Sequence, residues 1–282
     1  MEFKAPRTET EWSRRAIVNV VNALAVHAES LTLVGAHAVL LRTMDLDVPQ
    51  MPTGDGDLGV TPGLVGDVPS IEVLLRDAGY EHRTTARPGL WGRMPYDDAD
   101  GTRSYREKID LLAPHGLSGA VSPSRRGVPV MRSAHGKLAV GNAVGLELAA
   151  FNRSLMTMAD FADSRLSVQI HVADVPALIL AKGSKIGERI REPRKGMIRD
   201  KDLGDLWRLM SVADPSATAR VIAEFLDHPE IGLDVRRSVE WTAGVLRDPV
   251  SPERVKSVFD TFVDPAEIDR VFDTWRESST VW

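Results

Sequence analysis

The pattern of apolar residues changes type once, near Asp174, and this change constrains the fold more than any other feature of the sequence. Before that point, short alternating runs typical of strands mix with segments of helical spacing. After it, only helical spacing occurs. We therefore predict an α+β fold, with an α+β domain at 1–173 followed by a helical domain at 174–282.

The spacing also predicts where the individual elements lie. In the first domain we expect helices at about 11–28, 36–46 and 70–78. We expect strands there at 31–34, 55–60, 90–94, 108–112, 144–151 and 166–172, with 90–94 and 108–112 as the arms of a hairpin. In the second domain we expect helices at about 175–190, 202–211, 217–226, 235–246, 252–262 and 265–277.

The composition excludes several classes of protein. The 282 residues are 43% hydrophobic, which is enough for a buried core, and the absence of cysteine rules out disulfides and thiolate metal sites. A net charge of −5 gives no global attraction to nucleic acid, so such a partner would need a local basic patch. No apolar run approaches the roughly 20 residues that span a bilayer, and no signal peptide is evident. We expect a cytoplasmic protein without a membrane partner.

Two carboxylates stand side by side where an apolar strand opens. Asp55 and Asp57 are separated by Gly56, and alternate side chains of an extended segment share a face. Their oxygen atoms are hard ligands that suit Mg²⁺ or Mn²⁺. The same residues also fit an acidic turn, since Gly and Asp are common in turns. The metal interpretation therefore depends on what else the chain supplies.

A third carboxylate, Asp110, interrupts the apolar strand predicted at 108–112. Two divalent cations about 3.5–4 Å apart need a bridging ligand and one more carboxylate on a neighbouring strand. Asp110 meets that need if it faces the same way as Asp55 and Asp57. Alternatively, Asp110 is only the solvent-facing residue of an alternating strand.

A cationic stripe occurs on the first helix of the second domain. Lys182, Lys185 and Arg189 share one side of that helix, where they either hold a triphosphate or form an ordinary solvated face. Lys182 differs from the others because the apolar residues before it bury its stem, and a buried ammonium needs a carboxylate or a phosphate. Asp202 and Asp205 on the next helix offer such carboxylates, although they also suit a helix N-terminus.

Taken in order, these segments resemble the DNA-polymerase-β-type nucleotidyltransferase superfamily. Its signature is a strand ending in glycine, a short helix and a strand opening with Asp-x-Asp, and residues 31–36 and 53–60 stand in those places. More narrowly, 180–182 and 199–206 resemble the lysine helix and the Asp-x-x-Asp-Leu helix of the AbiEii-type group, which includes toxins of type IV toxin–antitoxin systems. The resemblance spans roughly 31–210 and implies a nucleotidyltransferase-type mixed sheet flanked by helices.

The resemblance implies a role for each candidate residue. The catalytic residues that it implies are Asp55, Asp57, Asp110, Lys182 and Asp205. The first three of these, Asp55, Asp57 and Asp110, are also the implied metal ligands. The nucleotide contacts that it implies come from Gly35, Ala36, Lys182 and Lys185. Family activity is the transfer of a nucleotide from an NTP to an acceptor with Mg²⁺ or Mn²⁺, and some toxin members modify the acceptor end of tRNA. A cognate antitoxin protein is then an implied partner.

Two features depart from the family pattern. Gly35 is followed by Ala36 rather than by Gly or Ser, so a serine hydroxyl contact to phosphate is missing. Asp45 and Asp47 form a competing Asp-x-Asp pair, and we prefer the later pair because Asp45 leaves only about nine residues for the preceding helix and turn. His37 either contacts a phosphate at a helix N-terminus or is a structural histidine with a local partner.

Two other functions fit the same residues. A degenerate nucleotidyltransferase fold would act as a nucleotide-binding or partner-binding module, and the altered turn at Ala36 favours it. A small-molecule nucleotidyltransferase of the antibiotic-modifying kind would share the site and differ in its acceptor pocket. A basic strip at 189–199 favours an anionic acceptor such as RNA, since phosphate contacts dominate affinity of that kind. The same strip also fits a solvated loop.

Overall fold

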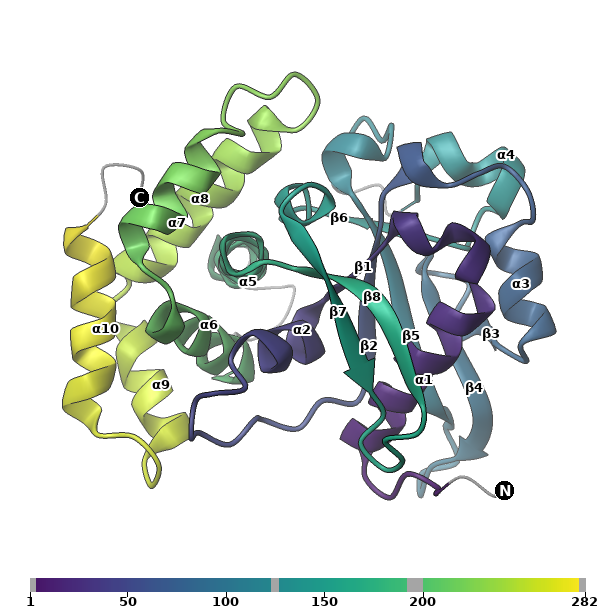
Figure 1. Ribbon diagram of the computed structural model, residues 1–282, viewed down its shortest axis with the longest axis horizontal. Coiled ribbons are helices and arrows are strands. Elements are labelled where there is room, and N and C mark those ends of the chain that lie inside the picture. The colour runs from purple at the N-terminus through teal and green to yellow at the C-terminus, as the bar shows by residue number, and fades with distance from the viewer. Residues whose placement is uncertain (1–3, 123–126, 192–199, 279–282) are drawn as a thin grey trace. The chain divides into compact units, whose positions relative to one another are not determined.

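The chain divides into two compact units, and the computed structural model describes residues 4–122, 127–191 and 200–278. The first unit consists of Met1–His37, Pro52–Ala143 and Arg153–Val172. The second consists of Ala38–Met51, Val144–Asn152 and Ala173–Trp282. The first unit contains the sheet, and the second contains helices α5 to α10 (Figure 1).

A mixed sheet forms the body of the first unit. Its strands run in the order β3-β4-β5-β2-β1-β8-β7, and β6 pairs with β5 off this path. The strands are β1 (Leu31–Val34), β2 (Gly56–Val60), β3 (Glu81–His82), β4 (Leu90–Asp97), β5 (Arg103–Pro114), β6 (Gly141–Ala143), β7 (Arg153–Ala159) and β8 (Ser167–Ala173). Strand β1 is antiparallel to β2 and parallel to β8, while β2 and β5 are parallel to each other.

Helix α1 (Glu9–Ala23) packs on β2 and β5. It begins with a capping box, in which the Thr8 side chain accepts from the Glu11 backbone and the Glu11 side chain accepts from the Thr8 backbone. A Cβ atom at Gly56 would lie 2.5 Å from Cγ1 of Ile17, so the glycine between the two aspartates allows α1 to approach the sheet closely.

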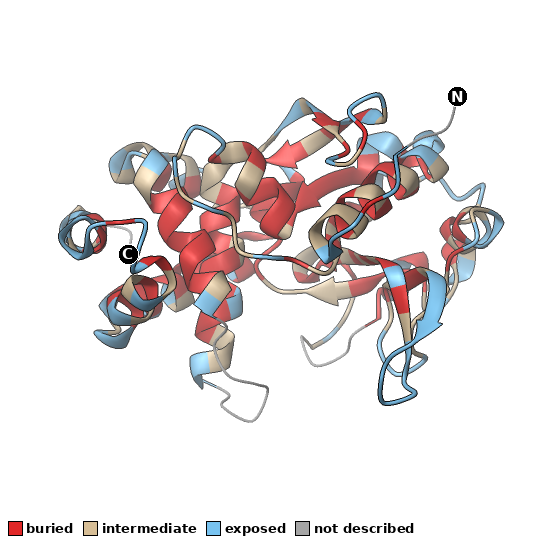
Figure 2. Ribbon diagram, turned by 90° about the horizontal axis from the view of Figure 1, so that it is seen from below, coloured by how far each residue is buried: buried red, intermediate tan, exposed pale blue. Residues whose placement is uncertain are grey.

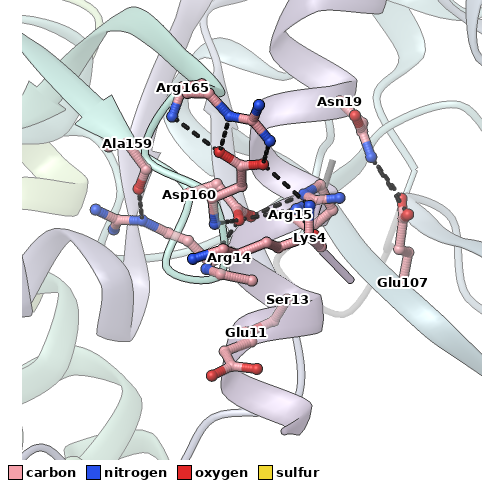
Figure 3. A network of polar contacts seen from close by, with 12 residues as sticks. Lys4, Glu11, Ser13, Arg14, Arg15, Asn19, Glu107, Ala159, Asp160 and Arg165 are labelled. Atoms are coloured by element: carbon pink, nitrogen blue, oxygen red, sulfur yellow. Dashed lines mark hydrogen bonds and ion pairs between the residues drawn. The ribbon is translucent and has the colours of Figure 1, made fainter. Parts of the chain in front are cut away.

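Polar side chains of α1 also hold it to the end of β7, to the residue that follows β7, and to β5 (Figure 3). The guanidinium of Arg15 donates to both carboxylate oxygens of Asp160 at 2.9 Å, and Nε of Arg14 donates to the carbonyl of Ala159 at 2.9 Å. Asn19 donates to Glu107 of β5 at 3.2 Å. These contacts fix the helix that lies behind the acidic strand β2.

The other helices of the first unit are short. These helices are α3 (Ile71–Asp77) and α4 (Arg132–His135), and 3-10 turns occur at Ala25–Ser30, Pro62–Leu64, His115–Leu117 and Pro129–Met131. Helix α2 (Gly35–Arg42) begins in the first unit and ends in the second. Buried residues are concentrated in the interior of each unit, while connecting loops and the tip of the β4–β5 hairpin are exposed (Figure 2).

The second unit is helical. Its helices are α5 (Val175–Arg191), α6 (Asp200–Val212), α7 (Pro215–Ala223), α8 (Gly232–Arg247), α9 (Val250–Phe259) and α10 (Pro265–Glu277), and Leu148–Ala150 adds a 3-10 turn. Helix α5 packs against α8 closely because two glycines face it. A Cβ at Gly183 would lie 2.0 Å from Oγ1 of Thr242, and one at Gly187 would lie 2.7 Å from Cβ of Trp241. The glycines of the predicted cationic helix therefore have a packing role.

The α+β class is confirmed, as are most of the predicted elements. The strand predicted at 144–151 is wrong, because this apolar run forms a buried turn and the 3-10 helix Leu148–Ala150, entered through Gly145 at φ +94°. The helix predicted at 11–28 ends at Ala23 and continues as a 3-10 segment. Strand β7 was not predicted, because its apolar residues do not alternate cleanly.

The division into units differs from two contiguous domains. The chain passes from the first unit to the second at 172–173, but Ala38–Met51 and Val144–Asn152 also belong to the second unit. These two segments come from the region where sequence spacing predicts the α+β domain. In the part of the chain that the structure describes, no helix combines the length and apolar character required to cross a membrane.

Candidate functional site

Asp57 and Asp110 are brought together by the parallel pairing of β2 and β5. They are in register, so that Asp57 lies opposite Asp110 on the neighbouring strand. Each is partly exposed and is flanked along its strand by buried residues, which places both side chains on the open face of the sheet. Asp55 directly precedes β2, and its charge acts on Asp110. We call Asp57 and Asp110 the carboxylate pair.

Gly35 packs directly against Asp57. Val34, the last residue of β1, lies in register with Asp57, and Gly35 follows at φ +69°. A Cβ atom at Gly35 would lie 2.0 Å from Oδ2 of Asp57. Both the backbone angle and the close approach therefore require glycine at this turn. Ala36 is the next residue of α2 and supplies no side-chain hydroxyl.

His37 lies in the first turn of α2 and is buried. Its Nε2 is 2.8 Å from Oγ of Ser13 on α1, and the same hydroxyl donates to the carbonyls of Thr10 and Thr53 at 3.0 and 3.2 Å. The geometry thus supports the structural interpretation of His37. This histidine links α1 and α2 to the start of the segment that carries Asp55.

Asp110 is electrostatically strained. Burial, together with the negative charges of Asp57 and Asp55, raises the pKa of Asp110 to about 7, against the opposing effect of Arg83 and Arg87. The guanidinium of Arg83 hydrogen-bonds to the Asp110 carboxylate. The charges that act on Asp110 therefore come from two carboxylates, which raise its pKa, and from two guanidinium groups, which lower it.

The side chains of Asp55, Asp57 and Asp110 are only partly arranged as the predicted metal site requires. Among residues 4–122, 127–191 and 200–278, no group of three or more His, Cys, Asp or Glu side chains is arranged to hold a metal ion. The carboxylate pair nevertheless offers hard oxygen ligands on adjacent strands, and the repulsion between its two charges would be relieved by a cation. The donor set therefore suits Mg²⁺ or Mn²⁺, with Arg83 as the present counter-charge of Asp110.

The competing pair Asp45 and Asp47 belongs to the second unit. Both residues are exposed, in a turn and loop that follow α2 in the second unit, and neither belongs to a strand. No strand partner holds them in register with a third carboxylate. The position of Asp57 within β2 therefore favours the later Asp-x-Asp pair.

Lys182 and Asp205 meet in the second unit. They belong to a group that we call the lysine cluster, which consists of Lys182, Lys185, Arg189, Asp202 and Asp205. Nζ of Lys182 lies 2.6 Å from Oδ2 of Asp205 and 3.4 Å from Oδ1 of Asp202. The sequence left a carboxylate and a phosphate open as partners of this buried ammonium, and carboxylates occupy it here.

Asp202 is the centre of the lysine cluster. It is fully buried, and it accepts from Lys185 at 3.1 Å and from Arg189 at 2.6 Å. Burial alone would raise the pKa of Asp202, but the positive charges of Lys182, Lys185 and Arg189 outweigh it and hold the pKa well below its usual range. The Lys185 side chain is 45% exposed, so it is the member most accessible to a ligand.

The sequence pattern did not predict Arg83 and Arg87 as part of the site. They lie in the loop between β3 and β4, and Arg83 is 27 residues from Asp110 along the chain. The predicted hairpin could have indicated this contact, because Leu90 pairs with Asp110 and the loop directly precedes Leu90. Composition alone gives no such signal.

The basic strip predicted at 189–199 lies largely outside the described residues, including Arg194, Lys195 and Arg199. Of its described members, Arg189 pairs with Asp202, and Arg191 pairs with Glu240 at 2.6 Å. These two cations therefore already have carboxylate partners.

No family model, curated protein or solved structure matches the chain.

Proposed function

We propose that this chain is a metal-dependent nucleotidyltransferase that moves a nucleotide from an NTP to a hydroxyl acceptor. The observation that supports the proposal most is the register of Asp57 with Asp110 on parallel strands, beside the glycine turn at Gly35. This arrangement combines two oxygen ligands with a close backbone approach at the start of a helix. The AbiEii-type resemblance extends the proposal to a toxin with tRNA as acceptor and a cognate antitoxin as partner.

The carboxylate pair would hold Mg²⁺ or Mn²⁺, with Asp55 as the third ligand. Bound metal would neutralise charge on the triphosphate and lower the pKa of the acceptor hydroxyl. Arg83 would release Asp110 when the cation binds, since both neutralise the same carboxylate. The released guanidinium would then be free to pair with a phosphate oxygen.

The chain's own groups supply positioning and proton transfer. Oxygen of the acceptor hydroxyl attacks the α-phosphorus of the NTP, the bond from that phosphorus to the bridging oxygen breaks, and pyrophosphate leaves. The hydroxyl proton passes to a carboxylate oxygen of Asp110, which also orients the hydroxyl. Backbone N–H groups at the Gly35–Ala36 turn would contact the phosphates.

A transfer assay tests the proposal. The full chain is incubated with each labelled NTP, with Mg²⁺ or Mn²⁺, and with total RNA or a protein extract. We expect label to pass to the acceptor with wild type and to be lost with Asp57→Asn. The matched control is the Asp45→Asn/Asp47→Asn double variant, which removes the exposed Asp-x-Asp pair and should leave transfer intact. No transfer by wild type, or undiminished transfer by Asp57→Asn, would contradict the proposal.

A second candidate function is a nucleotide-binding or partner-binding module on a degenerate fold. Two observations favour it: Asp110 is paired with Arg83, and no group of three metal-holding side chains occurs among the described residues. This module would bind an NTP without transferring it. NTP binding that needs no divalent metal and is unaffected by Asp57→Asn would support the module over the enzyme.

A further inference from the structure

A groove of about 300 Å³ lies in the first unit, outside the residues placed in the candidate site. One wall is the loop before β4, which contributes Thr85, Ala86 and Pro88. The facing residues come from the segment before β6. They are Gly127, Arg132, Lys137 and Leu138. The volume is at the lower end of the range for small-molecule sites.

The groove is positively charged. Arg132 and Lys137 are both exposed, neither makes an ion pair among the described residues, and no carboxylate lines the groove. The nearest acid to be considered is Glu72, which contacts Gly136 of the same segment: a Cβ atom at Gly136 would lie 1.9 Å from Oε2 of Glu72. Glu72 already forms an ion pair with Arg76 at 2.9 Å. The two cations are therefore available to an anion from solvent.

Close backbone contacts hold the groove's walls in place. Gly89 donates to the carbonyl of Leu138 at 2.8 Å, which ties one wall to the other, and Asn142 donates to the carbonyl of Gly127 at 2.9 Å. A Cβ at Gly141 would lie 2.7 Å from the carbonyl oxygen of Pro88. A side chain at Gly127 would displace Arg132, because its Cβ would lie 2.7 Å from Nη2. Arg132 and Lys137 therefore belong to a groove whose two walls are joined by hydrogen bonds and close packing.

The same loop joins this groove to the carboxylate pair. Arg83, at one end of the loop, pairs with Asp110, and Gly89, at the other end, accepts from the backbone of Leu111 at 2.8 Å. Thr85, Ala86 and Pro88 lie between these two anchors. An anion in the groove would therefore be held by the loop that also contacts the proposed catalytic carboxylate.

We infer that this basic groove is a binding site for a phosphate group of a nucleotidyl-transfer reactant, with Arg132 and Lys137 as its ligands. The inference rests on the proposed function for the identity of the reactant. The phosphate belongs either to the triphosphate of an NTP or to the backbone of an RNA acceptor. Arginine and lysine recognise both through charge-assisted hydrogen bonds.

The site is tested by binding to the full chain in EDTA, so that neither metal nor catalysis takes part. The probes are a labelled single-stranded oligoribonucleotide and a labelled ATP. We expect Arg132→Ala/Lys137→Ala to weaken one of them at least about tenfold. If the RNA is the ligand, the slope of log affinity against log salt should fall by about 1.4 for two lost contacts. The control Arg7→Gln/Arg106→Gln removes two exposed cations of the same unit outside the groove.

A second readout is acetylation of Lys137, followed by mass spectrometry of wild type. Protection by the oligoribonucleotide assigns the site to an acceptor phosphate, and protection by ATP assigns it to the nucleotide. Protection by neither probe, or equal weakening in the groove variant and the control, overturns the inference. The protection assay does not depend on nucleotide transfer. If wild type transfers no nucleotide but a probe still protects Lys137, the proposed enzyme activity is contradicted and the phosphate site is not.

Discussion

The carboxylate pair of the first unit and the lysine cluster of the second contain the same kind of acid in opposite electrostatic states. At the pair, burial and like charge raise the pKa of Asp110 to about 7. In the cluster, three cations hold the pKa of Asp202 well below its usual range, although it is fully buried. Burial raises the pKa of both acids, so neighbouring charge decides the outcome.

This difference in pairing distinguishes a group of acids that can bind a cation from one whose role is structural. Asp202 has three cationic partners within 3.4 Å, so the fold itself satisfies its charge. Asp110 is bonded to Arg83 and has Arg87 as a second cation, but two carboxylates lie nearby, so its charge is satisfied only in part. An acid left in excess can accept a cation from solvent, whereas a fully paired acid gains nothing from one. We expect ligands to change the first unit more than the lysine cluster.

The largest effect should come from Asp202→Asn. This change leaves three cations around a buried amide, and removing one partner of a buried ion pair costs about 3–5 kcal/mol. Urea unfolding followed by hydrogen exchange of peptides from α5 and α6 measures the loss. The control is Asp200→Asn, two residues earlier on α6, whose side chain is 54% exposed and pairs with Arg254. It should cost less than about 1 kcal/mol, and equal losses in both variants would remove the contrast.

Asp110→Asn should have the opposite sign. A shift from 3.8 to about 7 corresponds to about 4 kcal/mol of unfavourable interaction of the charged form, at about 1.4 kcal/mol per pKa unit. The amide removes the repulsion by Asp57 but loses part of the bond to Arg83. We expect the free energy of unfolding at pH 8 in EDTA to rise by about 1–2 kcal/mol. A loss as large as that of Asp202→Asn would show that Asp110 is as well paired as Asp202.

Divalent metal should stabilise the first unit selectively. At a Mg²⁺ concentration of about ten times its dissociation constant, the gain is about 1.4 kcal/mol. Hydrogen exchange of peptides from β2 and β5 should slow, while peptides from α6 should not change. Asp57→Asn should abolish the effect, and NaCl at matched ionic strength should not reproduce it. Slowing of both units together would indicate a general salt effect instead of a site.

The elements that carry these residues were predictable where local pattern and burial agree. The run at Leu31–Val34 is buried throughout, and residues of β8 alternate between buried and exposed, so both read correctly as strands. The run at 144–151 is equally apolar but folds as a turn, because a buried helical turn and a buried strand look alike over so few residues. Local pattern could not separate these two cases.

The site required information that no local pattern contains. The candidate residues Asp57 and Asp110 were recognisable from their spacing, but their register depends on the parallel pairing of β2 with β5. Arg83 reaches Asp110 only because the β4–β5 hairpin brings Leu90 opposite it. Long-range strand pairing, and not residue type, therefore decided which charges meet.

The smallest effect should come from Lys185→Gln, which tests how evenly the lysine cluster shares its charge. The Lys185 side chain is 45% exposed and lies 3.1 Å from Asp202, whereas Lys182 is 5% exposed. Solvent screens the exposed pair, so Lys185→Gln should cost about 0.5 kcal/mol, while Lys182→Gln should cost about 3 kcal/mol or more because it leaves Asp205 buried without its ammonium partner. Denaturant midpoints of the two variants measure the difference. A cost above about 2 kcal/mol for Lys185→Gln would mean that all three cations are needed to hold Asp202 ionised, and the cluster would then have no cation to spare for a phosphate.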